Sequence, residues 1–304
     1  MWPRTLRGEE KHRQHKRTEE VKLVLGFIRQ LRAIDSSFIS NTEILEFGSG
    51  DGFQLPYLQT IGHVTATDLY RSDSIKKYNG IEFVKCSITT APFRANKFDI
   101  IFSNHVIEHI TDLESAFKEL RRIGKANCLY AFSVPTALWL LLAVPADYYT
   151  KVKKLTRTLV DVVNKNGNRK SIARGRQPAS LLNIRRQAGN GFIPQSLRLL
   201  LPGGHGCHTG FIHCLSSFRV KLWTDLFQRY GFKILRIEPL LLYGDSEWPI
   251  IPTSRFLTRF GLCSSVLFLM EQVERQGGSE LEFRGSRNEV AGFLNNVSQS
   301  ELIR

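Results

Sequence analysis

The chain has 304 residues, of which 42% are hydrophobic and 23% charged, and its formal net charge is +14 at pH 7. A chain of this length can bury one large core, or one core with a cap. It shows no apolar stretch long enough to cross a bilayer and no signal-peptide region, and its five cysteines form no CxxC pair. We therefore expect a cytoplasmic protein rather than a membrane-spanning or disulfide-stapled one.

The first half of the chain changes from a charged arm to a regular alternation of strands and helices. Residues 1–20 are polar and highly charged and indicate a frayed arm, which leads into a helix near residues 21–33. Apolar runs predict strands at residues 43–47, 63–68, 81–85, 98–103 and 127–134. Helices are expected near residues 53–60, 72–78 and 112–123. This alternation is typical of an α/β fold.

The pattern stops after Pro135 for about eighty residues. It resumes with an amphipathic helix at residues 219–230, a strand at 232–243 and a shorter strand at 265–271. The tail from residue 276 is weakly apolar and predicts a loose segment. A long insertion therefore separates two parts of one α/β domain.

The most informative motif is a glycine-rich turn directly after the first strand, Glu46-Phe47-Gly48-Ser49-Gly50-Asp51-Gly52. Gly48 and Gly50 have no Cβ, so the turn can adopt positive φ and let the backbone approach a ligand closely. Asp68 ends the second strand, eighteen residues past Gly50. A carboxylate at that place can accept hydrogen bonds from both hydroxyls of a ribose. The layout is that of a nucleotide-binding βαβ unit.

With these motifs the chain resembles the class I S-adenosylmethionine-dependent methyltransferases. The resemblance runs from about residue 42 to 136, includes the segment 98–110, and has a second patch at about 203–244. It implies a Rossmann-like fold with a seven-stranded, mostly parallel sheet and a basic, partly helical cap inserted after strand five. It also implies S-adenosylmethionine as the cofactor, with the glycine turn holding its methionine half and Asp68 its ribose.

The resemblance assigns ten residues to the cofactor site. They lie in the glycine turn and at the carboxyl ends of strands two, three and four, and comprise Glu46, Gly48, Ser49, Gly50, Asp51, Asp68, Leu69, Ser87, Ile88 and Asn104. One of them departs from the family, which usually has an acidic residue at the position of Ser87 to bind the adenine amino group. A serine oxygen can accept that hydrogen bond without carrying charge, so weaker cofactor binding is expected.

The insertion carries most of the net charge. Residues 151–200 contain twelve Lys or Arg and a single acid, Asp161. An apolar run at 138–144 precedes them, too short to span a membrane but long enough to lie on one. The expected regions are an arm and helix (1–34), a cofactor-binding half (35–135), a basic cap (136–217), the rest of the methyltransferase domain (218–275) and a flexible tail (276–304).

Three interpretations of this cap remain open. An apolar segment followed by cations suits an anionic lipid surface or a lipid-linked substrate. A helix packed on the catalytic domain, with a solvated basic face, would have the same composition. Clustered cations also bind phosphate backbones, although residues 152–190 contain no aromatic side chain for base stacking.

If the acceptor is a hydroxyl, a general base must take its proton, and histidine is the usual choice. His208 is the first candidate, because methyltransferases found with bacterial surface-polysaccharide genes are similar here. They share a His-Gly-x-His loop, a Trp-bearing helix and a Gly-Phe strand start, which are residues 205–208, Trp223 and 231–232 in this chain. His109 is the second candidate, and either histidine could instead be structural.

Two sets of residues have spacings that could suit a metal, but no metal is predicted. His105, Glu108 and His109 would share one face if their segment were helical. The similar metal-binding segment of ubiquinone-pathway and small-RNA methyltransferases has Glu at the first position, where this chain has His105. The other set is Cys207, His208, His213 and Cys214, whose adjacent Cys-His pairs give an awkward zinc geometry.

The sequence thus predicts a methyltransferase that O-methylates a sugar hydroxyl on an anionic or lipid-linked glycan, at the cytoplasmic face of the membrane. One alternative is an RNA methyltransferase that uses the basic insertion on phosphates. The other is a membrane-associated scaffold that binds the cofactor without turnover. Expected partners are accordingly a small-molecule or lipid-linked glycan, an anionic membrane surface or, as the weaker prediction, nucleic acid.

Overall fold

The structure, a computed structural model, describes residues 4–32, 36–167, 211–244 and 254–273. The chain divides into two units, one formed by residues 1–146 and 204–275, the other by 147–203 and 276–304. Several predicted features lie outside the described residues. They are the loop at 205–207 with the predicted base His208, the tail at 276–304 and the part of the basic run that follows residue 167.

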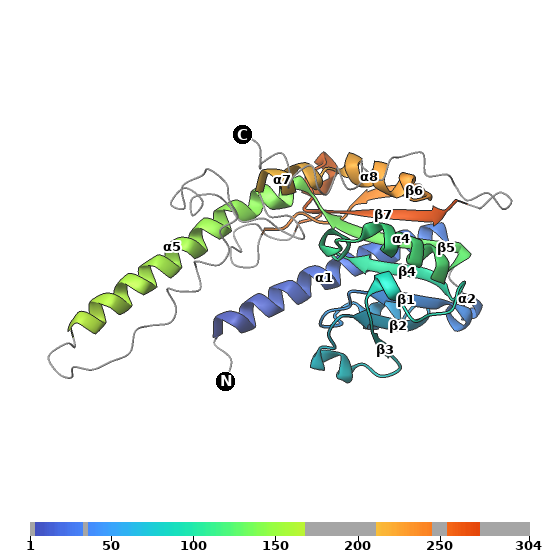
Figure 1. The fold of residues 1–304 in the computed structure, drawn as a ribbon, viewed down its shortest axis with the longest axis horizontal. Helices are drawn as coiled ribbons and strands as arrows, with labels where there is room; N and C mark the ends of the chain where they lie inside the picture. Colours follow the sequence, from blue (N-terminus) through green and yellow to red (C-terminus); the bar gives the residue numbers. More distant parts are fainter. Residues whose placement is uncertain (1–3, 33–35, 168–210, 245–253, 274–304) are drawn as a thin grey trace. The chain divides into compact units, whose positions relative to one another are not determined.

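A seven-stranded sheet forms the centre of the first unit (Figure 1). Its order is β3-β2-β1-β4-β5-β7-β6, and β7 alone runs antiparallel to its neighbours. The strands are β1 (Glu43–Phe47), β2 (His63–Asp68), β3 (Glu82–Lys85), β4 (Phe98–Asn104), β5 (Gly124–Pro135), β6 (Phe232–Pro239) and β7 (Ser265–Gln272). The predicted α/β fold with a seven-stranded, mostly parallel sheet is confirmed.

Helices cover both faces of this sheet, as its near-continuous apolar strands require. On one face α4 (Leu113–Ile123) and α8 (Val220–Arg229) bury aromatic side chains, among them Phe117 and Phe227, whose ring centroids lie 5.7 Å apart. The other face is covered by α1 (Arg4–Leu31) and the short α3 (Leu55–Leu58). The carboxyl ends of β1, β2 and β4 therefore open at one edge of a two-sided core.

Helix α1 is the largest departure from the sequence prediction. The structure is helical from Arg4 to Leu31, so the frayed arm expected over residues 1–20 is wrong for the described residues. The apolar stripe Val21, Val24, Leu25 and Ile28 packs on the core, as an amphipathic helix should. The charged half before it contacts the rest of the domain through the Arg13–Asp51 ion pair and the hydrogen bond from Arg17 to Asn104, which a sequence window cannot reveal.

Smaller differences concern connections and ends. The predicted helix at 53–60 is the single turn α3, and that at 72–78 is the 3₁₀ helix η1 (Asp73–Lys77). The strand expected at 232–243 ends at Pro239. After β5 the chain continues as α5 (Ala137–Gly167), and α7 (Phe211–Ser217) precedes α8. Among the described residues, none of the helices is both long and apolar enough to span a bilayer.

Candidate active site

The glycine turn between β1 and α3 has the conformation that its sequence predicts. Gly48, Gly50 and Gly52 have φ values of 72°, 52° and 74°, in the left-handed region that glycine tolerates. The amides of Gly48 and Ser49 both donate to the carbonyl oxygen of Thr67, at 2.8 and 3.0 Å. These bonds join the turn to the end of β2.

Asp68 lies directly against this turn. Its Oδ2 accepts a hydrogen bond from the amide of Gly50 at 2.9 Å, and its Oδ1 accepts one from Tyr70 at 3.3 Å. A Cβ built on Gly50 would meet no heavy atom of the described chain within 4 Å, so the turn faces open space. Leu69, also predicted to bind the cofactor, is exposed just beyond. A glycine turn, an open side and an adjacent carboxylate match the needs of a ribose-containing ligand.

We expect Gly48→Ala to destabilise the protein and to weaken cofactor binding. The left-handed conformation costs an L-residue about 1–2 kcal/mol. In addition, a Cβ at Gly48 would lie 2.3 Å from Cγ2 of Val106, in the loop after β4. Urea unfolding should show a lower midpoint, and Gly50→Ala should cost less because its Cβ would meet open space. Equal midpoints for Gly48→Ala and wild type would contradict the clash.

Glu46 is the penultimate residue of β1, and the buried Phe47 separates it from Gly48 of the turn. Its side chain is 1% exposed, and Oε2 has no hydrogen-bond partner among the described residues. Burial raises the pKa of Glu46 to about 8, with a smaller increase from Asp68 and an opposing effect of Arg17. Glu46 therefore carries a proton at neutral pH and can donate a hydrogen bond to a bound group.

The other predicted cofactor residues have partners within the chain. Asp51 pairs with Arg13 of α1 at 3.1 Å and accepts from Ser72 at 3.0 Å. Ser87 caps the 3₁₀ helix η2 (Ile88–Thr90), where its Oγ accepts from the amide of Thr89 at 3.3 Å. Ile88 is buried in the core. The Ser87 hydroxyl oxygen therefore already accepts a hydrogen bond as the N-cap of η2.

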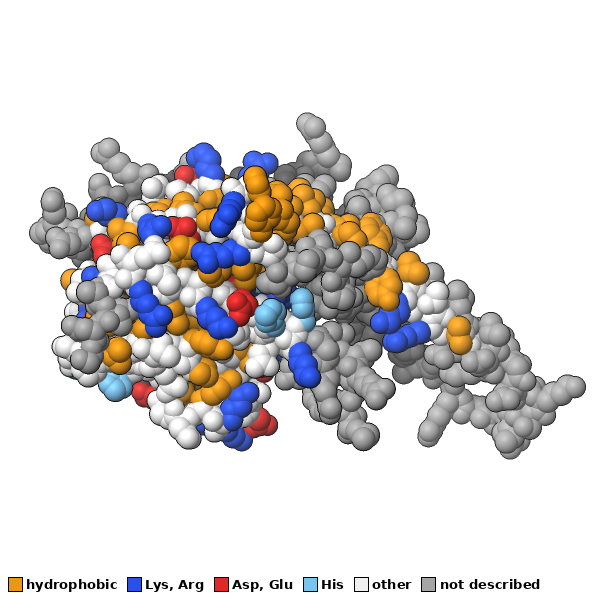
Figure 2. All heavy atoms as spheres, turned by 180° about the vertical axis from the view of Figure 1, so that it is seen from behind, with side chains coloured by type: hydrophobic (Ala, Val, Ile, Leu, Met, Phe, Trp, Pro, Cys, Tyr) orange, Lys and Arg blue, Asp and Glu red, His pale blue; other side chains and the backbone are white. Residues whose placement is uncertain are grey.

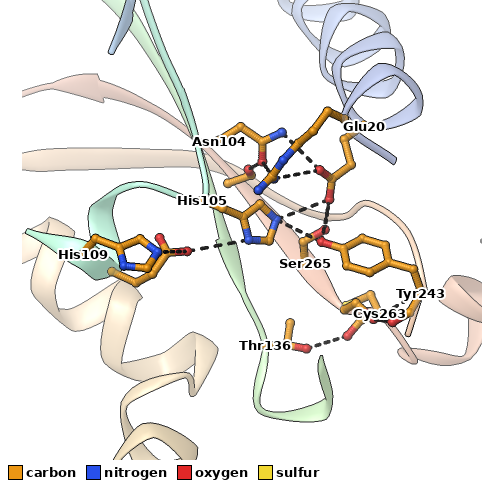
Figure 3. Close-up of polar contacts among 12 residues, drawn as sticks. Glu20, Asn104, His105, His109, Thr136, Tyr243, Cys263 and Ser265 are labelled. Atoms are coloured by element: carbon orange, nitrogen blue, oxygen red, sulfur yellow. Dashed lines mark hydrogen bonds and ion pairs between the residues drawn. The ribbon is translucent and has the colours of Figure 1, made fainter. Parts of the chain in front are cut away.

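A buried polar cluster lies beside the carboxyl end of β4 (Figure 3). At its centre is Glu20 of α1, which no feature of the sequence singled out. Glu20 Oε1 accepts from the Tyr243 hydroxyl at 3.0 Å and from Ser265 Oγ at 2.5 Å. Its Oε2 contacts Arg17 at 3.3 Å and accepts from Asn104 Nδ2 at 3.1 Å. Four segments distant in sequence meet at this one carboxylate.

Asn104 was predicted to bind the cofactor, and the structure places it in this cluster. Its Oδ1 accepts from Arg17 at 3.0 Å and from the Ser133 hydroxyl. Because both ends of the amide are bonded within the chain, its side chain is oriented before any ligand binds. Glu20 is the second of two adjacent acids, Glu19 and Glu20, immediately before the apolar stripe of α1, and nothing in the sequence distinguishes it from its neighbour.

Glu20 and His105 have depressed pKa values for different reasons. Burial alone would raise the pKa of Glu20, but the hydrogen bond to His105, the Arg17 guanidinium and the Ser265 hydroxyl outweigh it, and the charge of His105 adds to this lowering in acid, where the imidazole is protonated. Burial and then the charge of Arg17 lower the pKa of His105 to about 4. At neutral pH the cluster therefore holds a Glu20–Arg17 ion pair and a neutral imidazole.

The backbone of His105 is also unusual, because its φ is 57°. Few residues other than glycine adopt this region, and they do so where surrounding contacts enforce it. Its amide donates to the carbonyl of Ser133 at 3.0 Å, and its Nε2 lies 3.0 Å from the Tyr243 hydroxyl. The segment that follows is the 3₁₀ helix η3 (Ile107–His109), so the single α-helical face considered for a metal is not formed.

Glu108 and His109 end this loop. Glu108 is buried, whereas the side chain of His109 is 48% exposed. Glu108 Oε1 lies 3.7 Å from His105 Nδ1 and 3.9 Å from His109 Nε2. Within the described residues no group of three or more His, Cys, Asp or Glu is arranged to hold a metal ion. Of the second metal set, His208 and Cys207 lie outside the described residues.

The fold is α/β, and the glycine turn with Asp68 has the layout of a nucleotide-binding βαβ unit. Residues 45–132, less than a third of the chain, match the family model described as a methyltransferase domain. This match covers the glycine turn, Asp68 and β4. Over these residues the chain is therefore similar to a methyltransferase domain.

Solved structures of methyltransferases are similar to the chain at low sequence identity. One from Aquifex aeolicus is 12% identical, with a TM-score of 0.42 over 81% of this chain and 88% of that one. The 1,6-didemethyltoxoflavin-N1-methyltransferase of Burkholderia thailandensis is 13% identical, with a TM-score of 0.42 over 77% and 72%. Phosphoethanolamine N-methyltransferase 1 of Haemonchus contortus is 11% identical, with a TM-score of 0.48 over 95% and 48%. Curated proteins gave no match.

Proposed function

We propose that the protein transfers a methyl group from S-adenosylmethionine to a sugar hydroxyl of an anionic or lipid-linked glycan, at the cytoplasmic face of the membrane. The basic and partly apolar surface of α5 is the observation that supports this class of acceptor. The cofactor would be held by the glycine turn and by Asp68, whose carboxylate is already ordered through the amide of Gly50.

Helix α5 combines cations with exposed apolar groups after residue 147. Its exposed large hydrophobic side chains are Tyr148, Tyr149, Val152 and Val160. Lys151 and Lys153 lie over the rings of Tyr148 and Tyr149, at 5.3 and 5.6 Å from the centroids. Figure 2 shows Lys and Arg side chains next to hydrophobic ones along this helix. Tyrosines with flanking lysines are typical of helices that lie on anionic lipid.

The chemistry needs little from the protein beyond alignment and a base. Bound S-adenosylmethionine supplies the methyl group, and its sulfur leaves without needing a proton. The chain must align the acceptor, exclude water and take up the hydroxyl proton. His109 is the described residue that we assign to this last role, since its imidazole is half-exposed beside the end of β4. His208 is proposed for the same role from its loop motif.

Two other functions have a specific observation in their favour. The excess of cations over acids in residues 151–200 equally suits an RNA backbone. The use of Ser87 as a helix cap, at a place where relatives have an acid, suits a scaffold with weak cofactor binding. An RNA enzyme would bind RNA with an affinity that falls steeply with salt, and it would methylate RNA. A scaffold would transfer no methyl group to any acceptor.

We expect the full chain to float with vesicles that contain anionic lipid and to stay in solution with zwitterionic ones. Neutralising Lys151, Lys153 and Lys154 to Gln should abolish flotation, because roughly 1 kcal/mol is lost for each cation near an anionic surface. Lys118→Gln with Lys221→Gln, on exposed positions of α4 and α8, is the matched control and should float. Wild type that stays in solution with anionic vesicles would exclude the membrane part of the proposal.

The acceptor is tested separately with radiolabelled S-adenosylmethionine. Lipid-linked glycans, free oligosaccharides and RNA are supplied in parallel, and label should enter only the glycan fraction. Label in RNA would replace the glycan proposal with its alternative. No incorporation, together with measurable cofactor binding, would favour the scaffold.

A further inference from the structure

Glu108 lies between two imidazoles, and nothing in methyl transfer itself requires it to be there. Its Oε1 is 3.7 Å from His105 Nδ1 and 3.9 Å from His109 Nε2. Neither carboxyl oxygen has a hydrogen-bond partner in the described part of the chain, although the side chain is fully buried. An unsatisfied buried carboxyl is costly, and such groups often have a functional role. At these distances Glu108 faces both rings without a hydrogen bond to either.

The hydrogen bonds of Tyr243 fix which nitrogen of His105 carries the proton. The phenol has one proton, and the Glu20 carboxylate, 3.0 Å away, is its strongest acceptor. The phenol oxygen is then free to accept from His105 Nε2, also at 3.0 Å. A neutral imidazole has a single N–H, so Nδ1 presents a lone pair toward Glu108. A series of contacts thus runs from Glu20 through Tyr243 and His105 to Glu108.

A lone pair at this distance does not stabilise an ionised Glu108. Burial raises the pKa of Glu108 to about 8; its own backbone amide and Arg17 oppose this rise, and Glu20 adds to it. The charged or titratable groups around it are His105 and His109 from its own loop and Arg17 and Glu20 from α1. Burial, followed by Arg17, also lowers the pKa of His109. At neutral pH both Glu108 and His109 are therefore uncharged.

We propose that Glu108 is the positioning residue of a Glu108–His109 pair that acts as general base. The inference rests on the proposed role of His109. Ionised Glu108 accepts the Nε2–H of His109 and leaves Nδ1 to receive the proton of the acceptor. The O–H bond of the acceptor breaks, its electron pair stays on oxygen, and an N–H bond forms at Nδ1. The resulting imidazolium is balanced by the Glu108 carboxylate, as in other His–carboxylate pairs.

The pair has an inactive form with the opposite tautomer. When Glu108 carries its proton, it donates to His109 Nε2, and the single imidazole proton moves to Nδ1. Nδ1 then has no lone pair for the acceptor. The pair therefore becomes active as pH rises through the pKa of Glu108, and Glu20 helps to set that pH by holding the tautomer of His105.

The test is a pH titration of ¹⁵N-histidine-labelled full-length protein, with His109 assigned by comparison with His109→Gln. Long-range ¹H–¹⁵N spectra distinguish the two imidazole tautomers. In wild type we expect His109 to change from Nδ1–H to Nε2–H with a midpoint near pH 8, about the raised pKa of Glu108. Glu108→Gln should lack this step. Glu114→Gln, which removes an exposed carboxylate of α4 that pairs with Lys118, should retain it.

Three results would overturn the proposal. The first is an unchanged His109 titration in Glu108→Gln, and the second is a wild-type His109 that keeps one tautomer throughout. The third is a step that disappears on adding EDTA, because it would assign these residues to a metal. If Glu108→Gln does not fold, the wild-type titration decides alone. The readout needs neither cofactor nor acceptor, so a failure of the proposed methyl transfer is seen separately.

Discussion

Asp68→Ala should reduce the affinity for S-adenosylmethionine by roughly 100-fold or more, close to loss of measurable binding. Two charge-assisted hydrogen bonds to ribose hydroxyls, at about 1.5–3 kcal/mol each, would be lost. The change also removes the acceptor of the Gly50 amide, at 2.9 Å, so the turn loses one of its hydrogen bonds to β2 and keeps those to the Thr67 carbonyl. This prediction has the largest expected effect on function.

Calorimetric titration of the purified protein with S-adenosylmethionine measures this effect. Asp68→Asn keeps one side-chain oxygen and should bind with intermediate affinity. Asp225→Ala is the matched control, because it removes an exposed aspartate of α8 that pairs with Lys221. Wild-type affinity in Asp68→Ala would show that the cofactor does not bind at the glycine turn. Absence of binding in wild type would contradict both the proposed methyl transfer and the cofactor-binding scaffold.

Glu20→Ala should destabilise the protein by about 3 kcal/mol, because it leaves the buried donors of Tyr243 and Ser265 without their acceptor, at about 1–3 kcal/mol each. The loss also releases Arg17, which pairs with Glu20 at 3.3 Å. We expect the charged half of α1 to separate from the sheet first. A stability of about 5–15 kcal/mol is usual for a domain, so this one side chain accounts for a large share.

Urea unfolding of both proteins measures the loss. Glu19→Ala is the matched control on the same helix, since Glu19 makes an exposed pair with Lys22. Its effect should stay within about 0.5 kcal/mol. A midpoint for Glu20→Ala that equals that of wild type would show that the cluster does not hold α1.

Wild type should be more stable than Glu20→Gln at neutral pH, and this difference in stability should shrink as pH falls. Because the folded-state pKa of Glu20 lies below its ordinary value of 4.5, its stabilising effect is fully present above that value and is lost as pH falls below it. The same direction holds for His105, whose stabilising effect fades between its ordinary pKa of 6.5 and about 4. Urea midpoints of the two proteins should therefore converge in acid.

The sequence by itself determined the strands and the glycine turn. Short apolar runs, glycines at positive φ and a carboxylate at a strand end are local patterns, and neighbouring parallel strands bring them to one edge. For this reason Gly48, Gly50 and Asp68 lie together as predicted, and the seven-stranded sheet is confirmed. The weakest local predictions were short helices, where one turn of apolar residues fits both α and 3₁₀ geometry.

Only the tertiary structure decided the chemistry of the buried cluster. Glu20 and Tyr243 are 223 residues apart in sequence, and a charged helix such as the first half of α1 is marginal until such contacts hold it. The protonation state of a buried ionisable group depends on its neighbours rather than on its residue type alone. The same physical reason explains why Glu20 is ionised, Glu108 is protonated and His105 is neutral at one pH.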